Sequence, residues 1–314
     1  MTLSLSHATS KFFIFYLLFL NLSIASMLAV DYENALVIGH RGCGSNSATS
    51  IHNCFENTIE SFSTAHSIGA DAIEFDVHIT RDYVPVIFHN FCIPIEGKNV
   101  FIQDLTYAEF LRAGKEFVGR ERPHLDISDH RNVPGTLEEL FEHLNGNLMF
   151  NLELKYPLEN EMKEHNISKT IPREIFIQHV MQVVYKYRSR KVFFSSFDIN
   201  LLITLKHYDT SAHIFFLKDF VYNGNLSDFV PLFNQELRMC MLNGIDGIVF
   251  GLSTLNGDLG MLFNFIRSLN LRIMLYGKRL RDINLVRQLN DLHVVDGFIV
   301  DDVPSVAEIF KRIY

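Results

Sequence analysis

Short apolar runs and longer amphipathic segments alternate along most of the chain. Most of the apolar runs are continuous and rich in Val, Ile, Leu and Phe, which is typical of strands buried on both faces of a parallel sheet. On this pattern we predict strands at Ala35–Gly39, Ala72–Val77, Val84–Phe88, Leu148–Leu154, Val192–Phe194, His213–Leu217, Gly247–Phe250, Leu271–Leu275 and Gly297–Val300.

Helical patterns fill the intervals between these strands. In the first interval, Asn57 as N-cap and Glu60 three residues later indicate a helix from Thr58 to Ser67. Pro172 suits the start of another helix, because a missing N–H costs nothing there. The further predicted helices are Pro172–Arg188, Asn200–His207, Leu259–Leu269, Asp282–Leu289 and Val303–Arg312. Repeated alternation of strand and helix predicts a parallel α/β fold.

The number of strands narrows the fold class. Val84–Phe88 follows Val77 too closely for a parallel crossover, so we predict that these two strands form an antiparallel hairpin. Eight strands remain, which is the number that closes a (β/α)8 TIM barrel, and we place one such domain at residues 35–312. Residues 91–147 show no clear strand and are expected to form an irregular or helical insertion over the barrel mouth.

Carboxylates interrupt two of the apolar strands. Glu74 and Asp76 are two residues apart on one strand and therefore face the same way. Two unpaired carboxylates inside a barrel are costly, so we expect a divalent cation, Mg²⁺ or Ca²⁺, to bind between them. Glu153 ends the strand Leu148–Leu154 and would supply a third ligand, while Lys155 on the same face would attract a phosphate group. TIM-barrel active sites lie at such strand ends.

Two histidines and an arginine also follow predicted strand ends. His40 and Arg41 lie in the segment GHRG after the first strand, and the hairpin returns His89 towards the level of the two carboxylates. An imidazole exchanges protons near neutral pH, and an arginine holds phosphate oxygens through two hydrogen bonds. Each residue alone is more often structural. Their joint placement at strand ends favours phosphodiester cleavage by histidine acid–base catalysis.

Composition and the N-terminus bear on partners and location. The 314 residues carry a formal net charge of −8 without a dense Lys/Arg run, so nucleic acid is not an expected partner. Lys11, the apolar run Phe12–Leu20 and small residues up to Ala25 predict a cleaved secretory signal peptide at residues 1–25. The alternative is an uncleaved membrane anchor, since Phe12–Val30 is long enough to span a bilayer. Membrane contact is expected only in that second case.

In the secretory pathway the chain could be glycosylated and could form disulfides. Asn166 and Asn225 each begin an N-x-S pattern and are candidate glycosylation acceptors. Cys43 and Cys54 bracket a polar loop and are candidates for a disulfide, with Cys92 as the next candidate partner. The alternative is that all the cysteines, Cys240 included, are reduced thiols.

These residues, in this order, resemble the glycerophosphodiester phosphodiesterase family. The resemblance covers residues 35–310 and rests on GHRG (39–42), ENTIESF (56–62), GADAIEFDVHITRDYVPVIFHN (69–90), LELK (152–155) and VDGFIVDD (295–302). The segments VFFSSFD (192–198), IFFL (214–217) and 271–301 are most similar to eukaryotic glycerophosphocholine phosphodiesterases. The resemblance implies a TIM barrel of the phospholipase-C-like phosphodiesterase type. It also implies metal-dependent cleavage of small glycerophosphodiesters, in glycerophospholipid catabolism, to sn-glycerol 3-phosphate and an alcohol such as choline.

The resemblance also implies a role for each site residue. His40 and His89 match the general acid/base pair, without showing which is the acid. Arg41 and Lys155 match the phosphate binders, and the matching metal ligands are Glu74, Asp76 and Glu153. Glu56 is expected to order Arg41 or the substrate glycerol, although a carboxylate is also favoured there by the helix N-terminus that follows.

The chain departs from the family at two positions. Asn90 follows the second histidine where the family usually has Asp, so His89 is expected to be a weaker base and cleavage slower. Tyr276 ends the seventh barrel strand where many bacterial relatives have Trp, and it would contact choline through a cation–π interaction or simply pack in the barrel. Ser195, Ser196 and Phe197 are candidate pocket residues, with capping of the next helix as the alternative for Ser196.

Two other functions stay open at this stage. One is phospholipase D-like action on a lysophospholipid or sphingolipid, if the pocket admits an acyl chain. The other is a non-catalytic barrel that binds a ligand. Retention of both histidines and all three carboxylates argues against a non-catalytic barrel, and Asn90 alone favours it.

Overall fold

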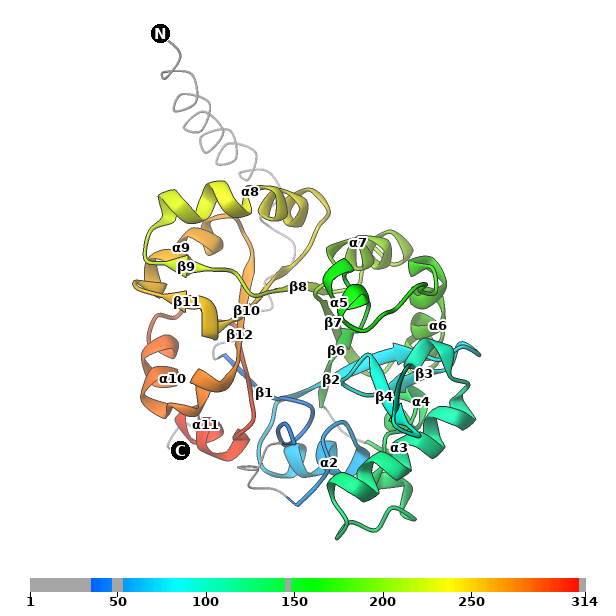
Figure 1. The fold of residues 1–314 in the computed structure, drawn as a ribbon. Coiled ribbons are helices and arrows are strands. Elements are labelled where there is room, and N and C mark those ends of the chain that lie inside the picture. The colour runs from blue at the N-terminus through cyan, green and yellow to red at the C-terminus, as the bar shows by residue number, and fades with distance from the viewer. Residues whose placement is uncertain (1–34, 47–52, 145–147, 311–314) are drawn as a thin grey trace.

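A closed ring of parallel strands forms the centre of the computed structural model, which describes residues 35–46, 53–144 and 148–310 (Figure 1). β1 pairs with both β2 and β13 and so closes the ring. In order around the barrel the strands are β1 (Leu36–Gly39), β2 (Ala72–Ile79), β6 (Met149–Leu154), β7 (Lys191–Ser196), β8 (Ile214–Lys218), β10 (Gly247–Gly251), β12 (Arg272–Tyr276) and β13 (Gly297–Val300). The predicted eight-stranded TIM barrel is confirmed.

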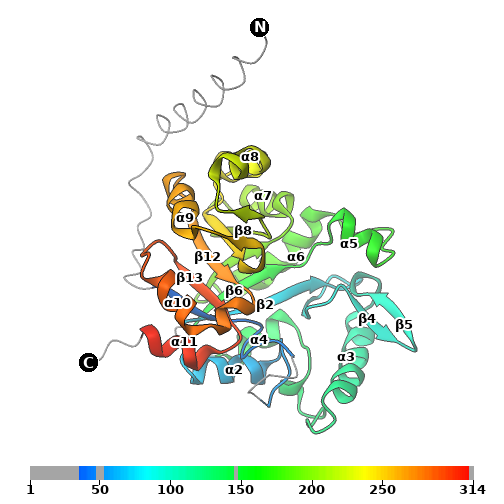
Figure 2. The same cartoon turned by 60° about the vertical axis from the view of Figure 1, so that its left-hand side comes forward.

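Helices surround the strands on the outside of the barrel (Figures 1 and 2). They are α2 (Ile59–Ser67), α4 (Leu137–His143), α6 (Arg173–Lys186), α7 (Ile199–Tyr208), α8 (Leu226–Leu242), α9 (Leu259–Ser268), α10 (Ile283–Asn290) and α11 (Val303–Phe310). The sequence pattern did not predict α8. Pro231 lies inside that helix, where it lacks the N–H for a helical hydrogen bond and weakens the helical signal.

The capping residue of α2 differs from the prediction. Thr58, not Asn57, accepts the hydrogen bond from the backbone N–H of Ser61. Asn57 adopts a left-handed conformation with φ of 58° and points its side chain elsewhere. The helix is therefore present as expected, but the side chain of Asn57 does not cap it and instead donates a hydrogen bond to Asp76.

Alternation along the strands separates two apolar layers. Residues that face outwards, such as Phe75 and Val77 of β2, pack in the main core with side chains of the surrounding helices. Residues that face inwards form a smaller cluster inside the barrel. Its buried members are Leu36, Ile38, Ala72, Phe193, Phe215, Leu217, Val249, Met274 and Ile299. This inner cluster fills the barrel and leaves the strand ends to carry polar groups.

The insertion after β2 contains more strand than the sequence indicated. β3 (Pro85–Ile87) pairs antiparallel with the end of β2, which confirms the predicted hairpin. Residues 91–147 hold a second hairpin, β4 (Cys92–Ile95) with β5 (Lys98–Phe101), and the long helix α3 (Tyr107–Glu121). Figure 2 shows these elements beside the barrel, and they contribute none of the described pocket-lining residues. Phe91, at the start of this segment, lies with its ring centroid 5.3 Å from Lys155 Nζ, and a position of the whole insertion over the barrel mouth stays a prediction.

The structure joins Cys43 to Cys54 in a disulfide, and Cys92 and Cys240 are free and buried. Asn166 and Asn225 are both exposed, and their glycosylation stays a prediction. The predicted signal peptide at residues 1–25 and the alternative anchor lie outside the described residues. Within the described part of the chain, every helix is too short or too polar to cross a bilayer.

Candidate active site

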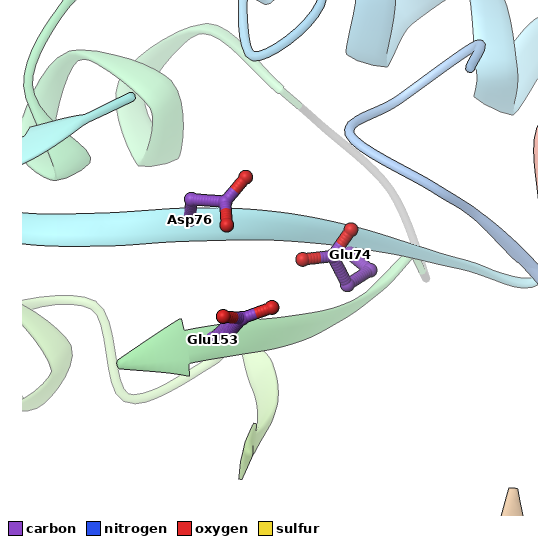
Figure 3. A group of neighbouring side chains, drawn as sticks. All are labelled: Glu74, Asp76 and Glu153. Atoms are coloured by element: carbon purple, nitrogen blue, oxygen red, sulfur yellow. The ribbon is translucent and has the colours of Figure 1, made fainter. Parts of the chain in front are cut away.

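Three acidic side chains meet on two neighbouring strands of the barrel. Figure 3 shows Glu74 and Asp76 on β2 and Glu153 on β6, with their carboxylates turned towards one another. One oxygen from each lies within 4.8 Å of the others. The parallel register between the strands produces this cluster, because it sets Asp76 directly beside Glu153.

The electrostatics of the cluster are unfavourable without a cation. Burial, together with the charges of Asp76 and Glu153, raises the pKa of Glu74 well above its usual value. Burial would also raise the pKa of Asp76, but the charges of His89, Lys155 and Arg41 outweigh it and hold that pKa low. Oδ1 of Asp76 is buried and accepts no hydrogen bond within the described structure. Carboxylate oxygens in this arrangement fit a hard divalent cation.

Two basic side chains are fixed beside the carboxylates. Arg41 donates its backbone N–H to Glu74 Oε2 at 2.9 Å, and its Nη1 donates to Glu56 Oε1 at 2.9 Å. Lys155 Nζ lies 2.8 Å from Glu153 Oε1 and 3.4 Å from Asp76 Oδ1. Burial would lower the pKa of Lys155, but these two carboxylates raise it above its usual value. Burial would likewise lower the pKa of Arg41, but Asp76, Glu56 and Glu74 raise it, so both side chains stay charged.

The two histidines have different partners. His40 follows β1, and its Nδ1 lies 2.8 Å from Asp301 Oδ1. His89 follows β3, and its Nδ1 lies 2.9 Å from Asn90 Oδ1, a neutral acceptor. Burial lowers the pKa of His89 and outweighs the opposite effect of Asp76. In its neutral form His89 would donate Nδ1–H to Asn90 Oδ1 and would have Nε2 to accept a proton.

Both histidines line one pocket, together with two of the clustered carboxylates, Glu74 and Glu153. Ser195 and Phe197 line it as expected, but Ser196 does not. The Ser196 hydroxyl donates to Leu154 O, and α7 is capped by Asp198. The lining residues are His40, Arg41, Glu74, His89, Asn151, Glu153, Lys155, Ser195, Phe197, Leu217, Tyr276 and Ile299. Asp76, Glu56 and Asn90 do not line the pocket but contact residues that do.

Sequence reasoning missed two residues that hold the site together. Asn57 Nδ2 donates to Asp76 Oδ2 at 2.8 Å and so orients that carboxylate. Asp301 holds His40 and also accepts hydrogen bonds from Ser45 N and Arg281 Nη2. The sequence held one indication for Asp301, which is its position directly after the last barrel strand. β13 pairs with β1 and sets Gly39 beside Val300, so the next residues, His40 and Asp301, are neighbours.

A TIM barrel whose rim brings three carboxylates, two histidines, an arginine and a lysine to one pocket defines a class of barrel phosphodiesterase. The comparison with protein families agrees: residues 40–305 match the model of the Glycerophosphoryl diester phosphodiesterase family, and the chain belongs to that family. It is accordingly a phosphoric diester hydrolase that acts on glycerophosphodiesters.

Curated relatives include plant and fungal proteins. The chain is 29% identical to "Glycerophosphodiester phosphodiesterase GDPD2" of Arabidopsis thaliana, over 88% of this chain and 77% of that protein. It is 27% identical to "Glycerophosphocholine phosphodiesterase GDE1" of Eremothecium gossypii, over 88% of this chain but only 26% of that longer protein. An Oleispira antarctica phosphodiesterase, solved with the product sn-glycerol-3-phosphate, shares the fold with a TM-score of 0.63 and 19% identity, over 89% of this chain and 98% of that one.

Proposed function

We propose that this protein hydrolyses glycerophosphocholine to sn-glycerol 3-phosphate and choline, with a divalent cation at the three-carboxylate cluster and the two histidines as acid and base. The observation that carries the proposal is that both imidazoles line the same pocket as Glu74 and Glu153. The head group is supported by the fungal relative, whose name specifies glycerophosphocholine.

Each group on the pocket wall has a task in such a reaction. Arg41 and Lys155 would bind the non-bridging phosphate oxygens and offset their charge. Glu74, Asp76 and Glu153 would hold Mg²⁺ or Ca²⁺, which when bound polarises a phosphoryl oxygen. One imidazole removes the proton from the attacking water or glycerol hydroxyl, and the other protonates the leaving choline oxygen. Asp301 and Asn90 orient these two rings through Nδ1.

Phosphorus-31 NMR tests the proposal directly. The protein with Mg²⁺ or Ca²⁺ should convert glycerophosphocholine to glycerol phosphate, and excess chelator should stop the reaction. A transient signal of a cyclic phosphate would show that the glycerol hydroxyl attacks first. Lysophosphatidylcholine in a parallel sample tests the phospholipase D-like alternative, which would release choline from this lipid instead.

A variant of one histidine tests the catalytic assignment. His40→Ala should lower kcat by about 10²- to 10⁴-fold, the usual contribution of general acid–base catalysis. His66→Ala on α2 is the matched control, because His66 is exposed on the outside of the barrel. An inactive wild-type protein with every glycerophosphodiester and both cations would support the ligand-binding alternative.

A further inference from the structure

The far wall of the pocket carries a hydrogen-bonded pair that the proposed chemistry does not use. Tyr276, at the end of β12, donates its hydroxyl to Asp219 Oδ1 at 2.7 Å. Tyr276 lines the pocket, and Asp219 directly follows β8 and is exposed. In the strand order, β8, β10 and β12 lie across the barrel from β1, β2 and β6, which carry the metal-site carboxylates and most of the basic groups. The pair therefore lies on the opposite side from the groups assigned to phosphate.

Strand alternation turns both side chains towards the pocket. On β8, Phe215 and Leu217 belong to the inner cluster, so Asp219 has the same inward phase. Lys218, between them, faces outwards and its Nζ lies 3.9 Å from Glu236 on α8. The positive charge next to Asp219 in the sequence is thus directed away from the pocket.

A glycine on the middle strand makes the contact possible. Gly251 ends β10, is paired with Tyr276 in the register, and has no side chain at the level where the two partners meet. A Cβ at this position would overlap Asp219 Oδ1 and would lie 3.0 Å from the Tyr276 hydroxyl oxygen. The φ of Gly251 is −74°, so its backbone does not require glycine, whereas the close approach of the pair does.

We propose that Asp219 and Tyr276 form a subsite that selects substrates whose leaving alcohol carries a positive charge, such as choline. The inference rests on the proposed function and adds the residues that choose the head group. A cation is attracted to the face of an aromatic ring and, more strongly, to a carboxylate nearby. The hydroxyl of Tyr276 is held by Asp219, which fixes the ring in the pocket wall. Phe197, at the end of β7, offers a second aromatic surface in the same pocket.

The positive charges on the opposite wall agree with a head-group subsite at Asp219 and Tyr276. Arg41 and Lys155 attract the phosphate and repel a quaternary ammonium group, so the head group is directed away from them. Two arginines after β12 do not compete for the subsite. Arg279 donates to the carbonyls of Leu252 and Leu255, and Arg281 donates to Asp301. Asp219 is thus the carboxylate that a cationic head group would meet beside Tyr276.

The test compares a cationic with a neutral substrate in one enzyme. The ratio of kcat/KM for glycerophosphocholine to kcat/KM for glycerophosphoglycerol measures head-group selection. Asp219→Asn keeps an acceptor for the Tyr276 hydroxyl but removes the charge, and the ratio should fall about fivefold, as expected for a cationic contact at an exposed site. Glu236→Gln removes one negative charge from α8, outside the barrel, and should leave the ratio at the wild-type value.

Two further measurements keep the inference testable if Asp219→Asn folds poorly. Raising KCl from about 0.02 to 0.5 M should lower the wild-type ratio, because salt screens an exposed charge. Gly251→Ala should lower it as well, because the new methyl group displaces Asp219. A wild-type protein that cleaves both substrates, with a ratio unaffected by salt and by these substitutions, overturns the subsite alone. A wild-type protein that cleaves neither substrate overturns the proposed function.

Discussion

The two walls of the pocket are built on opposite principles. The wall formed by β1, β2 and β6 holds buried and partly buried charges that lie close to one another: Arg41, Glu74, Asp76, Glu153 and Lys155. The wall formed by β8, β10 and β12 offers an apolar Leu217, a glycine and one exposed carboxylate held by Tyr276. In the proposed reaction the first wall would hold the cation and the phosphate, and the second would select the head group.

This difference has an energetic consequence. In the charged wall each group compensates the burial of another, so removal of one member leaves an uncompensated charge in a desolvated site. On the other wall Asp219 is exposed, and its replacement by Asn removes one charge while an acceptor for the Tyr276 hydroxyl remains. Substitutions should therefore have large effects on the first wall and modest, substrate-dependent effects on the second.

The largest effect is expected from Glu153→Gln, which neutralises one member of the carboxylate cluster. We expect kcat/KM to fall by about three powers of ten, because metal-ion catalysis supplies several kcal/mol of charge stabilisation. The substitution should also abolish the rise in melting temperature that Mg²⁺ or Ca²⁺ produces by binding the folded state. Steady-state kinetics and thermal unfolding with and without cation measure the two effects.

The matched control for this change is Glu159→Gln in α5 (Glu159–Glu164), because Glu159 is exposed and lies six positions further along the chain. It should retain both the activity and the cation-dependent stabilisation. A Glu153→Gln protein that is still stabilised by the cation to the wild-type extent would contradict the assignment of the cluster as a metal site.

A smaller effect is expected from Asp301→Asn, which keeps an acceptor for His40 and removes its charge. Burial would raise the pKa of Asp301, but the hydrogen bond and charge of His40 outweigh it and hold that pKa low, so the carboxylate is ionised at pH 7. A hydrogen bond to a charged group contributes about 1.5–3 kcal/mol. We expect kcat to fall about ten- to a hundredfold, with KM less affected.

The neighbouring Asp302→Asn controls for charge and position. Asp302 Oδ1 accepts a hydrogen bond from the backbone N–H of Ser305 at the start of α11, a contact that asparagine can keep. Its kinetics should match the wild type. An equal loss of activity in both variants would mean that the change acts on the fold of this segment and not through His40.

Most of the charged wall could be predicted from the sequence, because its residues stand in, or directly after, strands with a strong apolar pattern. Glu74 and Asp76 face the same way on any strand, and the parallel register brings Glu153 to them. The other wall was predicted only at Tyr276. Asp219 follows an ordinary apolar strand, and its contact with Tyr276 depends on the missing side chain of Gly251, which only the structure reveals.

The barrel fold was predicted from the sequence, and the elements that the prediction missed have local causes. The barrel strands were found because buried strands give continuous apolar runs, whereas β4 and β5 are short and partly exposed. Helix α8 was missed because it contains Pro231. Asp301 lies 261 positions from His40, and no periodicity links residues so far apart; closure of the barrel brings them together.

The smallest expected effect comes from Asn90→Asp, which places a carboxylate beside the other histidine. Burial holds the pKa of His89 below its usual 6.5. A carboxylate next to Nδ1 favours the imidazolium, so the pKa of His89 should rise by about one unit. The rate at pH 7 should change only a fewfold. The limb of the pH–rate profile that belongs to His89 should move to higher pH.

The limb of the pH–rate profile that moves shows whether His89 acts as the base or as the acid. If His89 is the base, activity requires its neutral form, and the acidic limb of kcat/KM against pH shifts upwards. If it is the acid, activity requires the imidazolium, and the basic limb shifts upwards instead. Asn99→Asp on β5 adds the same charge at an exposed site and should move neither limb. A profile in which Asn90→Asp also leaves both limbs in place would show that His89 takes no part in the proton transfers, and His40 would then be the sole imidazole acting on the reacting oxygens.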